Sequence, residues 1–358
     1  MKLYKQNNFD FLRFIFALFV VISHAYPLSG GSETNQWIYK VTNGQVVLAS
    51  IGLNGFFVIS GFFIFQSLQR SNTLLSYLKK RFLRLFPGLF IVLLLSLLIV
   101  PFLYTGDMPL FSNKEFLMYL PNNLSLYNFQ SSIKGVFDSN NYHAINGSLW
   151  TLRYEFSLYI ALLLLFYLKN YISIVKLILL AFFVFFFVLF NFYLAAFLGT
   201  SILGMEGYHI LNFSTFFIAG SFFSSIGFDK IKNKPSFFLI VTIIILLLVL
   251  IISLYFNFYS NIKHVVFTLL VLLMGFIRIP VLEDFNKIGD MSYGIYIYSF
   301  PIQQILMSIF KFSLLELIIS SVILSILLGY FSWHLVEKRS LFYKDKPILN
   351  LKGLIVKT

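Results

Sequence analysis

Apolar stretches of about twenty residues recur along the whole chain, and they constrain its fold more than any other feature. A helix needs roughly 20 predominantly apolar residues to cross the roughly 30 Å hydrocarbon core of a bilayer. Most of these stretches follow one another with short connections, which leaves no room for a separate soluble domain. Only 11% of the 358 residues are charged, against about a quarter in soluble domains. The chain is therefore predicted to be an all-α, polytopic integral membrane protein.

The hydrophobic pattern predicts about ten transmembrane helices. They form one domain over residues 1–336, followed by a short basic tail over residues 337–358. The eighth helix is interrupted near its end by Arg278 and Pro280. The predicted helices cover residues 9–26, 46–66, 85–104, 149–168, 174–198, 210–227, 236–256, 264–281, 291–310 and 313–335.

The distribution of Lys and Arg predicts the orientation. With the N-terminus in the cytoplasm, 20 of the 27 basic residues fall in cytoplasmic segments, 5 outside, and 2, Arg13 and Arg153, within helices. The positive-inside rule then places both termini in the cytoplasm. This topology and attraction to anionic membrane lipids explain the net charge of +13, so we infer no nucleic-acid partner. The absence of cysteine excludes thiol catalysis and disulfides.

The first predicted helix carries Arg13 and His24 on one face. An eleven-residue step returns to within about 20° of its starting direction and rises about 16 Å. An ionisable residue in a membrane span costs roughly 2.5 to 3.5 kcal/mol, so it marks a functional site. The alternative is that Arg13 extends to the interface and His24 is a satisfied polar residue between packed helices. Asp10, one turn before Arg13, can pair with it.

Two patterns on the next helices suggest packing and anion binding. Gly55 and Gly61 flank Ser60 in the second helix, and small residues let helices approach closely. Arg81 and Arg84 precede the third helix and are three residues apart, so they share a helix face. Such a pair can clamp phosphate groups with forked donors.

A polar run over residues 146–159 opens the fourth helix from the outer side. It contains Asn146, Trp150 and Arg153, and it places the carboxylate of Glu155 within the membrane. An ion pair between Arg153 and Glu155 is the structural alternative to a catalytic role for Glu155.

A second polar run, over residues 290–301, enters the ninth helix with Tyr293 and Tyr296. Phenols and hydroxyls at these positions can line a polar path, and an interfacial tyrosine belt gives the same pattern. No spacing of histidines and carboxylates along the chain predicts a metal site.

In their order along the chain, these patterns resemble membrane acyltransferase family 3, whose members O-acylate sugars and other extracytoplasmic acceptors. The resemblance extends from residue 11 to residue 337. Its most specific elements are the spacing of Arg13 and His24, the Arg81 and Arg84 pair, and the run from residue 146. That run is similar to the family signature Asn-Gly-x-Leu-Trp-Ser/Thr-Leu-x-x-Glu. Many relatives have a histidine where this chain has Ser299, so no histidine role is transferred to the ninth helix.

The resemblance implies a stand-alone O-acyltransferase of the bacterial cytoplasmic (inner) membrane. Acyl-CoA, by default acetyl-CoA, is the implied donor substrate, with no permanently bound cofactor. The implied acceptor is a hydroxyl of a cell-envelope glycan, such as O-antigen, capsule or exopolysaccharide, or of a lipid-linked sugar. Arg13, Arg81 and Arg84 are expected to hold the donor phosphates. The residues expected to line the substrate path are Asp10, Ser60, Asn146, Trp150, Arg153, Tyr293 and Tyr296.

His24 and Glu155 are the expected catalytic residues. A histidine suits a general base on the acceptor hydroxyl or a nucleophile that carries the acyl group, and both roles stay open. Glu155 is expected to orient the imidazole or to support the acceptor. Buried charges and basic residues on the cytoplasmic side also fit two other functions. One is a transporter or flippase of a lipid-linked glycan, and the other is a non-catalytic subunit of a glycan-assembly complex.

Overall fold

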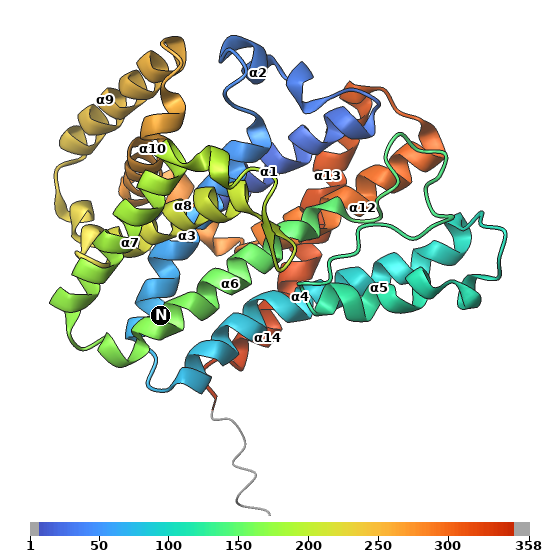
Figure 1. The fold of residues 1–358 in the computed structure, drawn as a ribbon, viewed down its shortest axis with the longest axis horizontal. Helices are drawn as coiled ribbons and strands as arrows, with labels where there is room; N and C mark the ends of the chain where they lie inside the picture. Colours follow the sequence, from blue (N-terminus) through green and yellow to red (C-terminus); the bar gives the residue numbers. More distant parts are fainter. Residues whose placement is uncertain (1–6, 347–358) are drawn as a thin grey trace, which may run out of the picture.

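The protein is built almost wholly from helices, with one short β-hairpin (Figure 1). A computed structural model describes residues 7–346. The long helices are α1 (Phe9–Leu28), α3 (Leu48–Gln69), α4 (Leu74–Leu103), α6 (Leu152–Leu162), α7 (Ile172–Phe192), α8 (Gly207–Ser225), α9 (Ser236–Tyr255), α10 (Tyr259–Phe276), α12 (Ser292–Phe310) and α13 (Leu314–Ser332).

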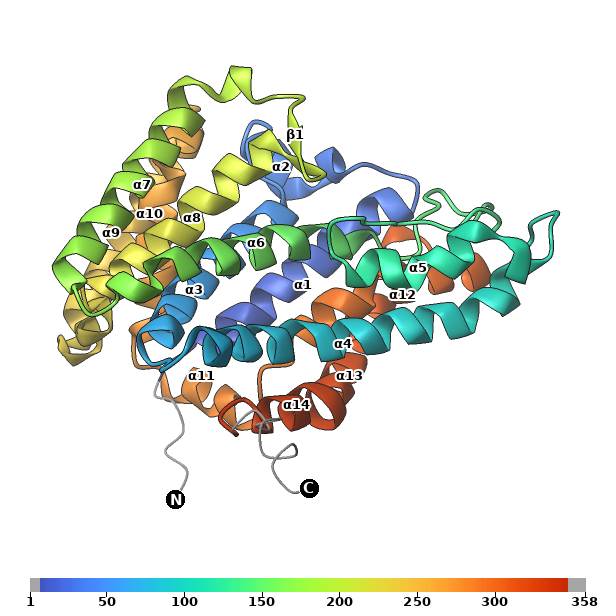
Figure 2. The same ribbon diagram turned by 60° about the horizontal axis from the view of Figure 1, so that its bottom comes forward.

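Short elements connect them. The hairpin pairs β1 with β2 in antiparallel register. The helix α5 packs along the outer part of α4, as both ribbon views show (Figures 1 and 2). These elements are η1 (Glu33–Asn35), α2 (Trp37–Val41), η2 (Leu110–Ser112), α5 (Lys114–Leu124), η3 (Gly147–Thr151), η4 (Leu163–Leu168), η5 (Leu194–Ala196), β1 (Ser201–Ile202), β2 (Met205–Glu206), η6 (Phe228–Asn233), α11 (Pro280–Asp284), η7 (Phe285–Lys287), η8 (Trp333–Glu337) and α14 (Lys338–Phe342).

Eight helical segments in the described part of the chain are long and apolar enough to cross a membrane. Together with α8 and α12, they lie near the ten positions predicted from the sequence. The predicted all-α polytopic fold is confirmed, and the protein is a multi-pass membrane protein. Most residues of α8 and α12 are buried by other helices. Because protein surrounds these two helices, they can carry more polar side chains than helices that face lipid.

The helix α4 begins earlier than predicted. The sequence predicted a start at residue 85, but α4 starts at Leu74, where the hydroxyl of Thr73 accepts a hydrogen bond from the Ser76 amide at 3.1 Å. The predicted start at residue 85 is therefore wrong, because an N-cap and good helix formers start the helix at residue 74. Arg81 and Arg84 lie one turn apart on this helix.

The last long helix also extends beyond its predicted end. The expected helix stopped at residue 335, whereas α13 continues through a π-helical turn, η8, into α14. Glu337, the first residue of the predicted tail, is only 1% exposed. The rest of that tail from residue 347 lies outside the described residues.

The helix α1 runs through the interior, between α3 on one side and α12 with α13 on the other (Figures 1 and 2). Close packing of α3 depends on its glycines. A Cβ atom at Gly61 would lie 1.9 Å from the carbonyl oxygen of Phe217 in α8, and one at Gly55 would lie 2.2 Å from the ring of Phe16 in α1. The predicted close helix approach at these two positions is confirmed.

Candidate active site

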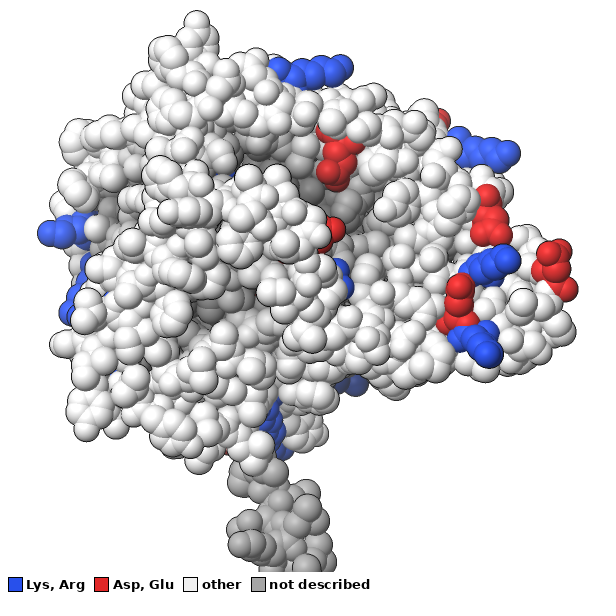
Figure 3. Space-filling model, viewed as in Figure 1, with Lys and Arg blue, Asp and Glu red and all other residues white. Residues whose placement is uncertain are grey.

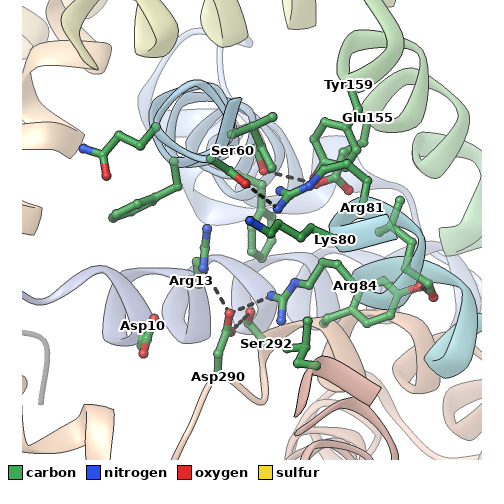
Figure 4. Close-up of a pocket in the computed structure, with 18 of the residues that line it drawn as sticks. Asp10, Arg13, Ser60, Lys80, Arg81, Arg84, Glu155, Tyr159, Asp290 and Ser292 are labelled. Atoms are coloured by element: carbon green, nitrogen blue, oxygen red, sulfur yellow. Dashed lines mark hydrogen bonds and ion pairs between the residues drawn. The ribbon is translucent and has the colours of Figure 1, made fainter. Parts of the chain in front are cut away.

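A cavity of about 950 Å³ lies between α1, α3, α4, α6 and α12 (Figure 4). It is lined along α3 from Arg70 to Leu53, a helix rise of about 26 Å. Asn7 and Lys344 both line it, so it opens where α1 begins and α14 ends. In the predicted orientation this is the cytoplasmic side, and the cavity reaches most of the way across the membrane.

Charged side chains are concentrated in this cavity. Seven basic and five acidic residues line it, so the cavity favours a ligand that is itself negatively charged. They are Arg13, Arg70, Lys80, Arg81, Arg84, Lys232 and Lys344, with Asp10, Glu155, Asp229, Asp290 and Asp345.

Asp290 binds two of the arginines. Its Oδ2 accepts hydrogen bonds from Nη1 of Arg13 at 3.0 Å and from Nη2 of Arg84 at 2.6 Å, and its Oδ1 accepts one from the Ser292 hydroxyl at 2.5 Å (Figure 4). Burial raises the pKa of the Asp290 carboxyl, but Arg84, Arg13 and the hydrogen bonds outweigh burial and hold this pKa well below its usual range. The ionised carboxylate therefore ties α1, α4 and the start of α12 together.

Glu337 completes this charge cluster from η8. Its Oε2 lies 3.8 Å from Nη1 of Arg84, and its Oε1 accepts a hydrogen bond from the Ser332 hydroxyl at 2.9 Å. Two arginines thus face two carboxylates, all four largely buried. The charges of Arg13 and Arg84 are compensated within the protein.

Arg81 has a different environment. Its Nη2 donates to the Ser67 hydroxyl at 3.1 Å, and its guanidinium carbon lies 5.7 Å and 5.6 Å from the ring centres of Tyr77 and Tyr159. Its buried Nε has no hydrogen-bond partner in the described structure. No carboxylate within residues 7–346 forms an ion pair with Arg81, so its charge is available to a ligand.

Glu155 faces the cavity and not Arg153. Its Oε1 accepts hydrogen bonds from the Ser60 hydroxyl at 3.1 Å and from the Tyr159 hydroxyl. Arg153 instead lies over the rings of Phe129 and Tyr154, at 5.7 and 5.6 Å. The structural alternative of an Arg153–Glu155 pair is therefore wrong, because residues two apart on a helix do not face each other.

The deep end of the cavity is closed by Tyr296. Its hydroxyl donates to the carbonyl oxygen of Ser148 at 2.5 Å and lies 2.5 Å from the hydroxyl of Thr151. Asn146 fixes the same segment, since its side chain accepts from the Ser148 amide at 3.1 Å and donates to the Ile297 carbonyl at 2.9 Å. The signature run therefore folds into η3, which ends the cavity.

His24 lies beyond this closure. It does not line the cavity, and its ring centre is 5.4 Å from that of Phe300, one helical turn past Tyr296 on α12. This turn corresponds to about 6 Å of rise. The buried Nδ1 of His24 has no hydrogen-bond partner among the described residues. The expected contact between Glu155 and the imidazole is not formed, because Glu155 points into the cavity instead.

The chain is similar to known proteins over most of its length. A family profile described as an acyltransferase domain matches residues 6–334. The chain belongs to acyltransferase family 3. It is therefore an acyltransferase, which favours the enzyme over the transporter and the non-catalytic subunit.

Two relatives in the family are informative. The chain is 28% identical to a protein named O-acetyl transferase from Shigella phage Sf6, over 98% of this chain and all of that protein. It is 29% identical to Nodulation protein 10 from Rhizobium leguminosarum bv. viciae, over 44% of this chain and 43% of that protein. No solved structure matched the chain.

The structure divides the predicted site residues of this acyltransferase into two groups. His24, Asn146, Trp150 and Arg153 lie on the outer side of the closure or within it. The residues that line the cavity are Asp10, Arg13, Ser60, Arg81, Arg84, Glu155, Tyr293 and Tyr296.

Sequence reasoning missed the acidic partners of the arginines. Asp290 opened the polar run of the ninth helix, and its position could have suggested a role. Glu337 had no such signal, because it was assigned to a solvated tail. Ser299, where relatives often have histidine, is buried and donates to the Tyr296 carbonyl at 3.2 Å. No group of three or more histidine, aspartate and glutamate residues in the described part could hold a metal ion.

Proposed function

We propose that the protein is an O-acetyltransferase of the bacterial cytoplasmic membrane. It transfers an acetyl group from acetyl-CoA, which enters from the cytoplasm, to a hydroxyl of a cell-envelope glycan or lipid-linked sugar outside. The supporting observation is the cavity, which has basic side chains at its mouth and ends at Tyr296, one helical turn before Phe300, whose ring contacts that of His24. The full-length similarity to a protein named O-acetyl transferase supports the acetyl group.

In this proposal Arg81 is the principal phosphate ligand. Its guanidinium has no acidic partner among residues 7–346, whereas Arg13 and Arg84 already bind Asp290. A phosphate at Arg84 would compete with a hydrogen bond of 2.6 Å. Arg13 and Arg84 then hold the wall of the donor site, and the basic mouth attracts the remaining phosphates. The thioester at the far end of the pantetheine arm lies near Tyr296, at the deep end of the cavity.

The chemistry at His24 takes one of two forms. As a general base, the imidazole accepts the proton of the acceptor hydroxyl while the hydroxyl oxygen attacks the thioester carbonyl. The C–S bond breaks, and the CoA thiolate takes up the proton. As a nucleophile, the imidazole attacks first, which gives acyl-histidine and CoA thiol. The acceptor oxygen then takes the acyl group, the acyl–nitrogen bond breaks, and the hydroxyl proton returns to the imidazole. In both forms Tyr296 must move aside for the thioester to reach His24.

The decisive experiment measures both products with purified protein in lipid nanodiscs. Labelled acetyl-CoA and de-O-acetylated envelope polysaccharide should give labelled polysaccharide and free CoA thiol in equal amounts. A thiol reagent reports CoA without background, because the chain contains no cysteine. Movement of a lipid-linked glycan without thiol release would support the transporter instead.

His24→Ala should reduce the transfer rate by about 10²- to 10⁴-fold, the usual contribution of a positioned acid–base group. The matched control is His143→Ala, because the side chain of His143 lies in the outer loop and is 61% exposed. Unchanged transfer by His24→Ala would exclude both forms of the mechanism. Mass spectrometry of acid-quenched protein separates them, since only the nucleophile form leaves an acetyl group on His24.

A further inference from the structure

The outer side of η3 carries a cluster of aromatic and polar side chains that the donor cavity does not use. We infer that this cluster is the acceptor subsite and that Trp150 is the platform on which a sugar ring of the glycan stacks. The inference rests on the proposed function, because it locates the acceptor of that same reaction.

The helix η3 has two different sides. Thr151 lines the donor cavity, and its hydroxyl contacts Tyr296. A 3₁₀-helix turns about 120° per residue, so the neighbouring Trp150 points elsewhere. Its ring centre lies 4.5 Å from that of His209 and 5.4 Å from that of Tyr154. The donor and acceptor sites would then share one short helix as their common wall.

Hydrogen-bonding groups surround the indole. The Tyr154 hydroxyl accepts from the Glu206 amide at 2.7 Å, and the Glu206 carboxylate lies 3.7 Å from Nε2 of His209. The Arg153 guanidinium lies under the hairpin, because a Cβ atom at Gly204 would be 2.8 Å from its Nη1. Nε of Arg153 and Nδ1 of His209 have no hydrogen-bond partner in the described structure.

This chemistry fits a neutral polyhydroxylated ring. An aromatic face covers the apolar face of a sugar, and a small number of placed donors and acceptors bind its hydroxyls. Arg153 and the imidazole supply donors, and Glu206 supplies an acceptor. The carboxylate of Glu206 disfavours an anionic group such as a phosphate, so the cluster differs in kind from the donor cavity.

The cluster is open to the outer side and close to His24. The side chains of Glu206 and His209 are 72% and 28% exposed. Figure 3 shows a hollow near the middle of this mostly uncharged face, with charged side chains in it and at its edge.

Contacts connect the cluster to His24 through Phe300. The ring of Phe300 contacts that of His24 and packs so closely on Gly147 that a Cβ atom there would lie 2.6 Å from it. Trp150 follows Gly147 by three residues of η3, about 6 Å. A short glycan segment stacked on Trp150 can therefore present a neighbouring hydroxyl to His24.

The test separates acceptor binding from donor chemistry. The probe is the envelope polysaccharide of a gene-deletion strain, which lacks the ester that this enzyme adds. Trp150→Ala should raise KM for this polysaccharide by about five- to tenfold, the scale of one lost aromatic contact. CoA thiol release from acetyl-CoA without polysaccharide is measured in parallel, so that a change in the KM for polysaccharide is compared with the donor reaction of the same protein. Trp150→Phe, which keeps a ring, should restore most of the affinity.

The matched control is Trp37→Ala, since Trp37 is an outer-side tryptophan outside the cluster and 64% exposed. This substitution should change neither the KM for polysaccharide nor the rate of CoA thiol release. An unchanged polysaccharide KM in Trp150→Ala, with or without a lower kcat, would overturn the inference while the proposed function stands. If the wild type neither releases CoA nor labels polysaccharide, the proposed function fails and the inference fails with it.

Discussion

Arg81 and Arg84 lie one turn apart on the same helix, yet they occupy regions of opposite electrostatic character. Arg84 enters a closed cluster in which Asp290 and Glu337 compensate its charge. Arg81 is held between two tyrosine rings and, within the described part of the chain, has only a serine hydroxyl as a hydrogen-bond partner. Identical side chains at helix spacing therefore support different roles: Arg84 holds helices together, whereas Arg81 can bind a ligand.

The largest expected effect is on stability, from Arg84→Ala. Its removal leaves the largely buried carboxylate of Glu337 without an arginine and leaves Asp290 with Arg13 alone. Removing one partner of a buried ion pair typically lowers the free energy of unfolding by about 3–5 kcal/mol. We expect a much lower melting temperature of the detergent-solubilised protein, measured by the loss of its monodisperse chromatographic peak after heating.

Arg81→Ala is the matched control for that measurement, because it removes the same side chain from the same helix. It should keep a melting temperature near that of the wild type. Equal destabilisation by both substitutions would remove the distinction between the two arginines.

The second effect is on donor binding, from Arg81→Ala. A hydrogen bond to a charged group contributes about 1.5–3 kcal/mol. We therefore expect KM for acetyl-CoA to rise by about 10- to 100-fold. Acetyl-pantetheine, which lacks the nucleotide phosphates, should react equally with the variant and the wild type. A loss of rate with both donors would mean that Arg81 does not bind phosphate.

The third effect compares the two carboxylates of the cluster. Asp290→Asn weakens hydrogen bonds of 3.0 and 2.6 Å to two arginines, and we expect a cost of about 2–3 kcal/mol. Glu337→Gln removes a charge 3.8 Å from Arg84, beyond hydrogen-bond distance, and keeps an oxygen for Ser332, so a smaller cost than that of Asp290→Asn is expected. The same thermal assay measures both, and the reverse order would show that Glu337 is the main partner of Arg84.

The smallest expected effect is the pH dependence of the contribution that Asp290 makes to folding stability. Its folded-state pKa is below the ordinary aspartate value of about 3.9. Its contribution is therefore complete above pH 4 and is lost as the pH falls through the lower folded-state pKa. The difference in melting temperature between the wild type and Asp290→Asn should stay constant from pH 8 to about pH 5 and narrow below pH 4. Because Glu337 shares Arg84 with Asp290, both proteins in this comparison also carry Glu337→Gln. A difference that still changes between pH 6 and 8 would contradict an ionised Asp290.

Much of the fold could be predicted because membrane helices are encoded locally. Each apolar stretch satisfies its own backbone hydrogen bonds, so length and hydropathy were enough to place the long helices. The wrong predictions were the start of α4 and the end of α13, where the helices extend beyond the apolar stretch and include charged residues. Those charged turns are stable because they pack on other helices, which local hydropathy does not reveal.

The candidate site could be predicted only in part. Arg13 and Glu155 stood out because charge inside an apolar helix is costly. Arg81 and Arg84 stood out because their spacing places them on one helix face, and all four residues line the cavity. Their partners did not stand out. Arg13 and Asp290 are 277 residues apart, and no spacing rule connects positions so distant in sequence.

The sequence alone determined the membrane-spanning class, the number and order of the long helices, and which helices carry chemistry, because these depend on local composition and spacing. Only the tertiary structure decided which charges are compensated. It also separated Glu155 from Arg153 and His24, and closed the cavity at Tyr296, one turn before the Phe300 ring that contacts His24. The physical reason is that ion pairing and enclosure depend on distances between helices, and these are set by packing at positions such as Gly61.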